Sequence, residues 1–200
     1  MTALGVHRII ERQSAVGGDR VAIETEDLAL TYRELNQRAN GVARTLISRG
    51  LRRSSHVVVR MERSPELAIA LLAVLKAGAA YTWIDASKAD GRWPYGLSLI
   101  ENGVPRPILV DMQVLMTASR PAPNLPIVTR PNDIACALPQ VNGLPAVLVP
   151  HASIAELGGQ PIPERSAWSG DAGALDLWLP LMAGALVTVD AAPAHVAAAA

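Results

Sequence analysis

Apolar residues along the chain recur at two spacings: every third or fourth position, and every second position or in short runs. The first spacing, at Val6, Ile9 and Ile10, predicts an amphipathic helix near the start of the chain. Short apolar runs at 21–23 and 28–30 flank a polar turn and predict a β-hairpin. This alternation of helix-like and strand-like segments favours an α/β fold, in which a sheet is covered by helices.

The clearest helix start is at Thr31. Glu34 follows three residues later, so the two side chains can form a capping box. Apolar residues continue at helical spacing from Leu35 to Leu46, and Gly50 marks the expected end of the helix.

A βαβ unit is expected next. The run 56–61 predicts a buried strand, and Ser64-Pro65-Glu66 supplies the cap, first-turn proline and acidic residue of a helix start. That helix should end at Gly78 and lead into a strand at 80–84, so the two strands should be parallel with a right-handed crossover. Lys76 lies near the helix C-terminus, where a cation interacts favourably with the helix dipole.

The second half of the chain continues the alternation. A helix is expected over residues 95–100, closed by Asn102-Gly103. A proline-rich link is expected over 120–126 and a turn over 160–165. Further strands are expected at 107–110, 127–129, 134–138, 146–149 and 186–189, and a further helix at 174–182.

Composition narrows the class of protein. Two hundred residues, 50% of them hydrophobic, are enough for one globular domain spanning residues 1–200. The formal net charge is zero and the basic residues are scattered, so we expect neither nucleic acid nor a membrane as partner. The longest apolar helix, near 67–75, is too short to span a bilayer, and the N-terminus has no secretion signal. The single cysteine, Cys136, excludes an intramolecular disulfide and suits the cytoplasm, where we expect the protein.

Three segments carry longer motifs: LTYREL at residues 30–35, LKAGAAYTWID at 75–85 and DAGALDLWLPL at 171–181. They resemble motifs of the amino-acid adenylation domains of nonribosomal peptide synthetases, members of the AMP-forming adenylate enzyme family. The third is similar to the family's F-D-x-S segment and the helix after it. The resemblance implies the N-terminal subdomain of an adenylate-forming enzyme, incomplete at the C-terminus, in a family that uses ATP and Mg²⁺.

The segment between the second and third motifs lacks the chemistry of a phosphate-binding loop. Such a loop needs glycines whose backbone N–H groups converge on the anion, hydroxyl donors and a cation. In the family it reads close to Y-T-S-G-S-T-G-x-P-K-G, but residues 134–150 contain one glycine and no Ser or Thr. Asn142, Gly143, Pro145 and Ala146 form this degenerate loop, with Ala146 where the family has its lysine. We therefore expect no ATP binding in the family's manner and no cofactor.

Two residues remain as site candidates. The resemblance implies that Asp171 receives the α-ammonium group of an amino acid, although an Asp directly before an apolar helix also suits an N-cap. His151 matches the family's V-P-H turn at a helix start; it suits either a structural turn or proton transfer. Neither residue has neighbours at the spacing of a catalytic triad or a metal site, so we expect no catalytic residue and no metal.

These features predict a non-catalytic, adenylation-like protein that acts as a binding or scaffold component. Two alternatives remain: half of a split ATP-dependent amino-acid-activating ligase completed by a partner chain, and a relic fragment. If the subdomain lacks the half that packs beside it, apolar surface should be exposed around 174–182 and 186–189. We therefore expect a homodimer or a complex with a peptide synthetase protein, with Leu177, Leu181 and Leu186 at the contact.

Overall fold

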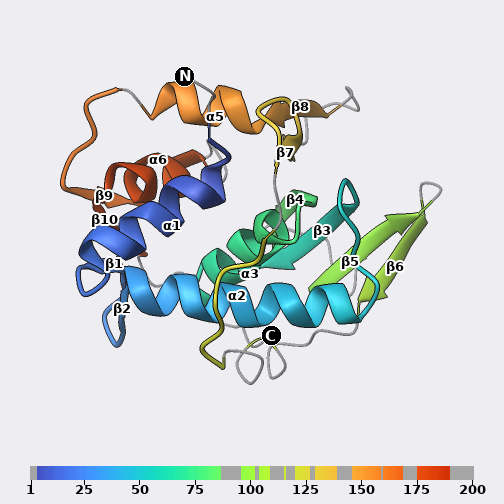
Figure 1. Ribbon diagram of the computed structural model, residues 1–200, viewed down its shortest axis with the longest axis horizontal. Coiled ribbons are helices and arrows are strands. Elements are labelled where there is room, and N and C mark those ends of the chain that lie inside the picture. The colour runs from blue at the N-terminus through green and yellow to red at the C-terminus, as the bar shows by residue number, and fades with distance from the viewer. Residues whose placement is uncertain are drawn as a thin grey trace, which may run out of the picture.

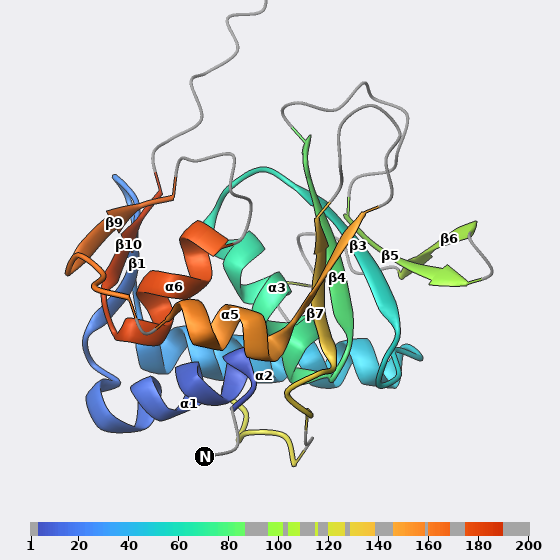
Figure 2. The ribbon, with the colours of Figure 1, turned by 90° about the horizontal axis from the view of Figure 1, so that it is seen from above.

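The computed structural model shows two β-sheets with helices packed between and beside them (Figures 1 and 2). This arrangement confirms the predicted α/β class. No helix in the described part of the chain is long and apolar enough to cross a membrane. The structure describes residues 4–86, 96–101, 104–108, 115, 120–126, 129–138, 146–158, 160–168 and 175–189.

The four-stranded sheet joins early and late parts of the chain. β1 (Val21–Glu24) and β2 (Ala29–Thr31) form the predicted antiparallel hairpin. β10 (Leu186–Thr188) lies parallel to β1 on one side and to β9 (Arg165–Ala167) on the other, which gives the order β2-β1-β10-β9. The sequence did not predict β9, since its three residues have no apolar run.

The six-stranded sheet is built on the predicted βαβ unit. β3 (His56–Met61) and β4 (Ala80–Asp85) are parallel and are joined by α3 (Pro65–Lys76). β7 (Ile134–Leu138) lies parallel to β4, and β8 (Val147–Pro150) lies antiparallel to β7 at one edge. The strand order is β6-β5-β3-β4-β7-β8.

The prediction of a helix over residues 95–100 is wrong. This segment forms β5 (Gly96–Glu101), which lies antiparallel to β3 and to β6 (Val104–Ile108). A run of six residues is too short for periodicity to separate a helix from a strand. Asn102-Gly103, which we interpreted as a helix end, is also the commonest sequence for a two-residue hairpin turn, and Glu101 pairs with Val104 across it.

Of the strands expected at 107–110 and 127–129, the structure contains the first. The strand expected at 107–110 is β6, which begins earlier, at Val104, and pairs with β5 through Pro105 and Pro107 as well. Of the strand expected at 127–129, the structure describes Thr129 alone, and Thr129 lies outside any strand.

The two N-terminal helices begin where the sequence indicates. α1 runs over Val6–Gly17 and α2 over Tyr32–Ser48. The capping box of α2 is present: the Glu34 N–H donates to Thr31 Oγ1 (3.2 Å), and the Thr31 N–H donates to Glu34 Oε2 (2.9 Å). Each of these two backbone N–H groups therefore has a side-chain partner.

The core forms around α3. Residues 67–75 of this helix are all buried, and α2 packs on one side of it. Figure 2 shows α3, α5 (His151–Leu157) and α6 (Leu175–Ala183) between the two sheets. The four-stranded sheet thus shares one core with the six-stranded sheet, through these helices.

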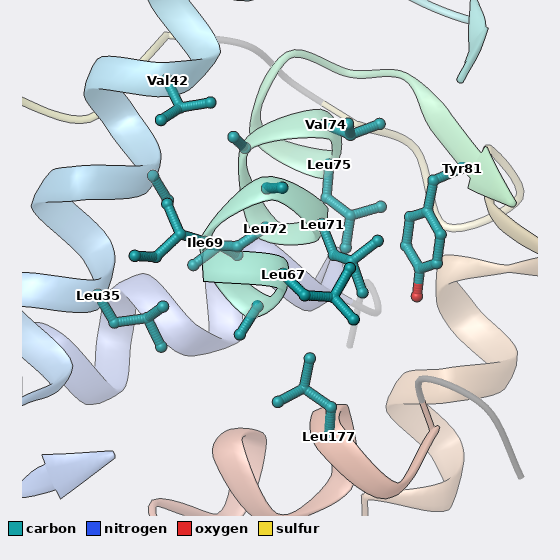
Figure 3. Close-up of a cluster of buried hydrophobic side chains, with 14 of the residues drawn as sticks. Leu35, Val42, Leu67, Ile69, Leu71, Leu72, Val74, Leu75, Tyr81 and Leu177 are labelled. Carbon is teal, nitrogen blue, oxygen red and sulfur yellow. The ribbon is translucent and has the colours of Figure 1, made fainter. Parts of the chain in front are cut away.

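The apolar surface expected to be exposed at Leu177 and Leu181 is instead buried within the chain. Leu177 and Leu181 are 0% exposed, because α1 and α5 both pack on α6. Figure 3 shows Leu177 pointing from α6 toward the side chains of α3. Leu186 is half-buried in β10, which lies between two other strands and is therefore no edge strand.

Candidate functional site

The degenerate loop connects two strands at the ligand-binding edge of the larger sheet. β7 runs parallel to β4, with Cys136 opposite Tyr81, so the carboxyl ends of β3, β4 and β7 meet at one edge. Crevices at the carboxyl ends of parallel strands are where α/β sheets bind ligands. β8 returns antiparallel with Val147 opposite Leu138, and residues 139–146 join the two strands.

The loop residues themselves are largely outside the described part of the chain. Asn142, Gly143 and Pro145 are not described, whereas Ala146 is described and is exposed. The position where the family has a lysine is therefore a solvent-exposed methyl group, with neither charge nor hydrogen-bonding capacity.

Two tryptophans and an ion pair lie at the same edge. The Arg63 guanidinium is 5.2 Å from the centroid of the Trp83 ring, and its nitrogen is 3.6 Å from Asp85 Oδ2. The Trp168 ring centroid lies 5.7 Å from that of Trp83, and the indole N–H of Trp83 donates to the Met61 carbonyl. Arg63 is thus already engaged by an aromatic face and a carboxylate.

Sequence reasoning missed Arg63. Its one signal was its place directly after a buried strand, where loop side chains meet at the carboxyl edge. Trp168 is buried, and its ring packs on Trp83.

The structure leaves Asp171 untested, because it lies outside the described residues. The structure describes the residues on both sides of it. The backbone N–H of Trp168 donates to the Thr188 carbonyl, and α6 begins at Leu175. Amine recognition and helix capping both stay predictions for this residue.

His151 connects α5 to α1. It is the first residue of α5 and is 1% exposed. Its Nδ1 accepts the backbone N–H of Val6, the first residue of α1, at 3.2 Å. Burial lowers the pKa of His151 to about 4, and Asp133 opposes the shift. The imidazole is therefore neutral at pH 7 and supplies the cap that Gly5 lacks, which favours the structural interpretation over proton transfer.

A second buried polar group lies at the end of α3. Lys76 is 1% exposed, and its Nζ is 2.6 Å from Glu11 Oε1. Burial lowers the pKa of Lys76 to about 8, while the Glu11 carboxylate raises it. Asn124 Oδ1 accepts from Asn36 and Asn40 at 3.0 Å each and from Lys76 at 3.5 Å. These contacts fasten the proline-rich link to α2 and α3, so Lys76 has a structural role beyond the helix dipole.

Cys136 is unsuited to act as a nucleophile. Burial raises the pKa of Cys136 to about 11, so its thiolate is scarcely populated at pH 7. Among the residues that the structure describes, no three His, Cys, Asp or Glu side chains gather as a metal site would require.

Comparison with known proteins gives a consistent result. Residues 10–101 match the family described as AMP-binding enzyme. The chain is 47% identical over 96 residues to tyrocidine synthase 3 of Brevibacillus parabrevis, covering 48% of this chain and 2% of that protein. It is 30% identical over 211 aligned positions to the second subunit of surfactin synthase from Bacillus subtilis, covering 91% of this chain and 6% of that protein.

The fold has solved counterparts. The N-terminal subdomain of Klebsiella oxytoca NpsA superposes with a TM-score of 0.73 at 26% identity, covering 96% of this chain and 56% of that one. The same subdomain in complex with anthranilyl-AMSN gives a TM-score of 0.74 at 25% identity, covering 96% and 55%. These findings confirm the resemblance: the chain is similar in sequence to adenylation domains of nonribosomal peptide synthetases and has the fold of their N-terminal subdomain. It spans a small fraction of its curated relatives, and the family match ends before the degenerate loop.

Proposed function

We propose that this chain is a non-catalytic adenylation-type domain of nonribosomal peptide biosynthesis, which acts as a binding or scaffold component. The observation that carries the proposal is the chemistry of residues 139–146. This segment connects β7 to β8 at the ligand-binding edge and contains one glycine, no hydroxyl and no charge. A polyphosphate bound there would lose its hydration and gain few hydrogen bonds in return.

Among the residues that the structure describes, the cation beside Trp83 does not replace the missing lysine. The cation that the structure describes beside Trp83 is Arg63, and Asp85 already offsets its charge. Recruiting Arg63 to a phosphate would bring the anion close to the Asp85 carboxylate, which repels it. This electrostatic arrangement supports a protein that retains the adenylation fold without its nucleotide chemistry.

Calorimetric titration with Mg²⁺–ATP tests the proposal. The matched variant replaces residues 139–146 with S-G-S-T-G-L-P-K, the family pattern at equal length with Leu144 retained. The NpsA N-terminal subdomain, whose structure is described as a complex with anthranilyl-AMSN, serves as the positive control with that ligand. We expect no saturable heat from the natural chain at millimolar ATP and measurable binding by the variant.

Each result has a clear meaning. A micromolar dissociation constant for the natural chain overturns the proposal. A variant that folds but gains no ATP affinity shows that the loop is not the limiting feature, and the proposal then loses its support. Amino-acid-dependent pyrophosphate exchange by the natural chain, alone or with a synthetase protein added, would instead support the split-ligase alternative.

A further inference from the structure

In the described part of the chain the two sheets have four edge strands, and three of them carry features that discourage pairing with another chain. β2 and β9 are three residues long. β6 contains Pro105 and Pro107, which have no backbone N–H to donate, and Arg106 between them is exposed. Short strands, prolines and charges are the usual means by which proteins protect sheet edges.

β8 is also short and ends at Pro150, but it is uncharged and its side chains at the free edge are apolar. Its first two residues, Val147 and Leu148, are 49% and 61% exposed. They are the one adjacent pair among the large apolar side chains exposed in the described part of the chain. No charged residue occurs from 134 to 155, so the whole β7–β8 hairpin and the start of α5 are uncharged. An apolar, uncharged edge strand is a site for strand addition.

We infer that β8 pairs antiparallel with β8 of a second copy of this chain, so that the two six-stranded sheets become continuous across a twofold axis. A twofold axis brings identical strands together antiparallel, and each copy then contributes the same surface. Two β8 strands can pair without like charges facing each other, because β8 carries no charge. The formal net charge of the chain is also zero, so two copies do not repel each other strongly. A charged peptide would find no opposite charge along this edge.

The contact has a predictable strength. β8 has four residues and ends at Pro150, so the main-chain pairing is short. Interfaces of this size fall well below the area of stable dimers. The dimer should therefore be in rapid, concentration-dependent equilibrium with the monomer, with a dissociation constant in the micromolar range or weaker.

Sedimentation velocity across a concentration series tests the inference with two charge substitutions. Leu148→Lys places like charges across the twofold contact, whereas Val16→Lys changes the 80% exposed side chain of α1. The C-terminal end of α1 lies beside the four-stranded sheet, away from β8 (Figure 1). We expect Leu148→Lys to weaken dimerisation at least about tenfold and Val16→Lys to leave it unchanged. Circular dichroism confirms that both variants keep their secondary structure.

Crosslinking supplies a second readout. Leu148→Cys should be captured as a dimer by a short bis-maleimide, and Val16→Cys should not. The natural Cys136 gives little background because it is buried. A chain that is monomeric at all concentrations, a dimer that Leu148→Lys leaves intact, or open-ended polymers would each overturn the inference. ATP plays no part in these measurements, so their outcome is separate from that of the nucleotide titration.

Discussion

Protonation of His151 should lower the free energy of unfolding as the pH falls. The imidazole is buried, and its Nδ1 must be free of a proton to accept the N–H of Val6. Protonation would remove this acceptor and place a charge in the core. The ring centroids of His151 and the buried His7 are 5.7 Å apart. Burial is the main cause that lowers the pKa of His7 to about 2, and the neighbouring His151 adds to the shift. His7 therefore cannot share the proton.

The magnitude follows from the pKa of His151, which folding lowers from 6.5 to about 4. Because the folded pKa is the lower one, the unfolded chain binds more protons between these values, and the free energy of unfolding falls as pH falls. At about 1.4 kcal/mol per pH unit, His151 alone should remove about 3 kcal/mol across the whole window. Between about pH 7 and pH 5 the loss should be about 2 kcal/mol.

Urea unfolding followed by tryptophan fluorescence measures this loss, since Trp168 and Trp178 are buried. The matched variant is His151→Asn, whose amide oxygen can occupy the place of Nδ1 and cannot titrate in this range. The variant should lose about 2 kcal/mol less than the natural chain between about pH 7 and pH 5. His7 is common to both chains and cancels to first order. Equal losses in both would refute the assignment of His151 as a neutral helix cap.

Three further substitutions test the packing. Thr31→Ala removes the capping box of α2 and should lower the free energy of unfolding by about 1 kcal/mol; an unchanged urea midpoint would contradict the cap. Leu35→Ala empties a fully buried position and should cost roughly 2 to 5 kcal/mol, compared at equal m-value. Glu11→Gln removes the carboxylate that raises the pKa of Lys76, leaves the buried amine without its counter-charge and should cost about 3 kcal/mol. Adding Lys76→Met to Glu11→Gln should recover most of that loss, and failure to recover it would show that the pair is not the main contact.

The sequence was informative where local chemistry determines the structure. Thr31 and Glu34 specified a helix start because both halves of the capping box lie within four residues. Ser64 and Pro65 did the same for α3, and the apolar runs on either side fixed the parallel pair of β3 and β4. None of these features depends on residues distant in the chain.

The sequence-based predictions failed where the structure of a segment depends on residues far away in the chain. The segment 96–101 became a strand because β3 and β6 offered hydrogen-bonding partners on both sides, and its own six residues did not reveal this. Leu177 and Leu181 were recognised as apolar, but their burial depends on α1 and α5, which lie far apart in the sequence. The role of His151 was hidden for the same reason: its partner, Val6, is 145 residues away.

Three contacts that stabilise this fold lie away from the degenerate loop. The capping box, the Lys76–Glu11 pair and the His151 cap all lie among the helices, and none uses a residue of the segment 139–146. These three contacts do not depend on phosphate chemistry in that segment, and a scaffold has to keep such contacts. This separates the scaffold hypothesis from the relic alternative. A scaffold should unfold cooperatively and show the acid dependence expected of His151, even though it binds no ATP. A relic has no requirement to stay folded, and a chain without a cooperative urea transition at neutral pH would favour that alternative.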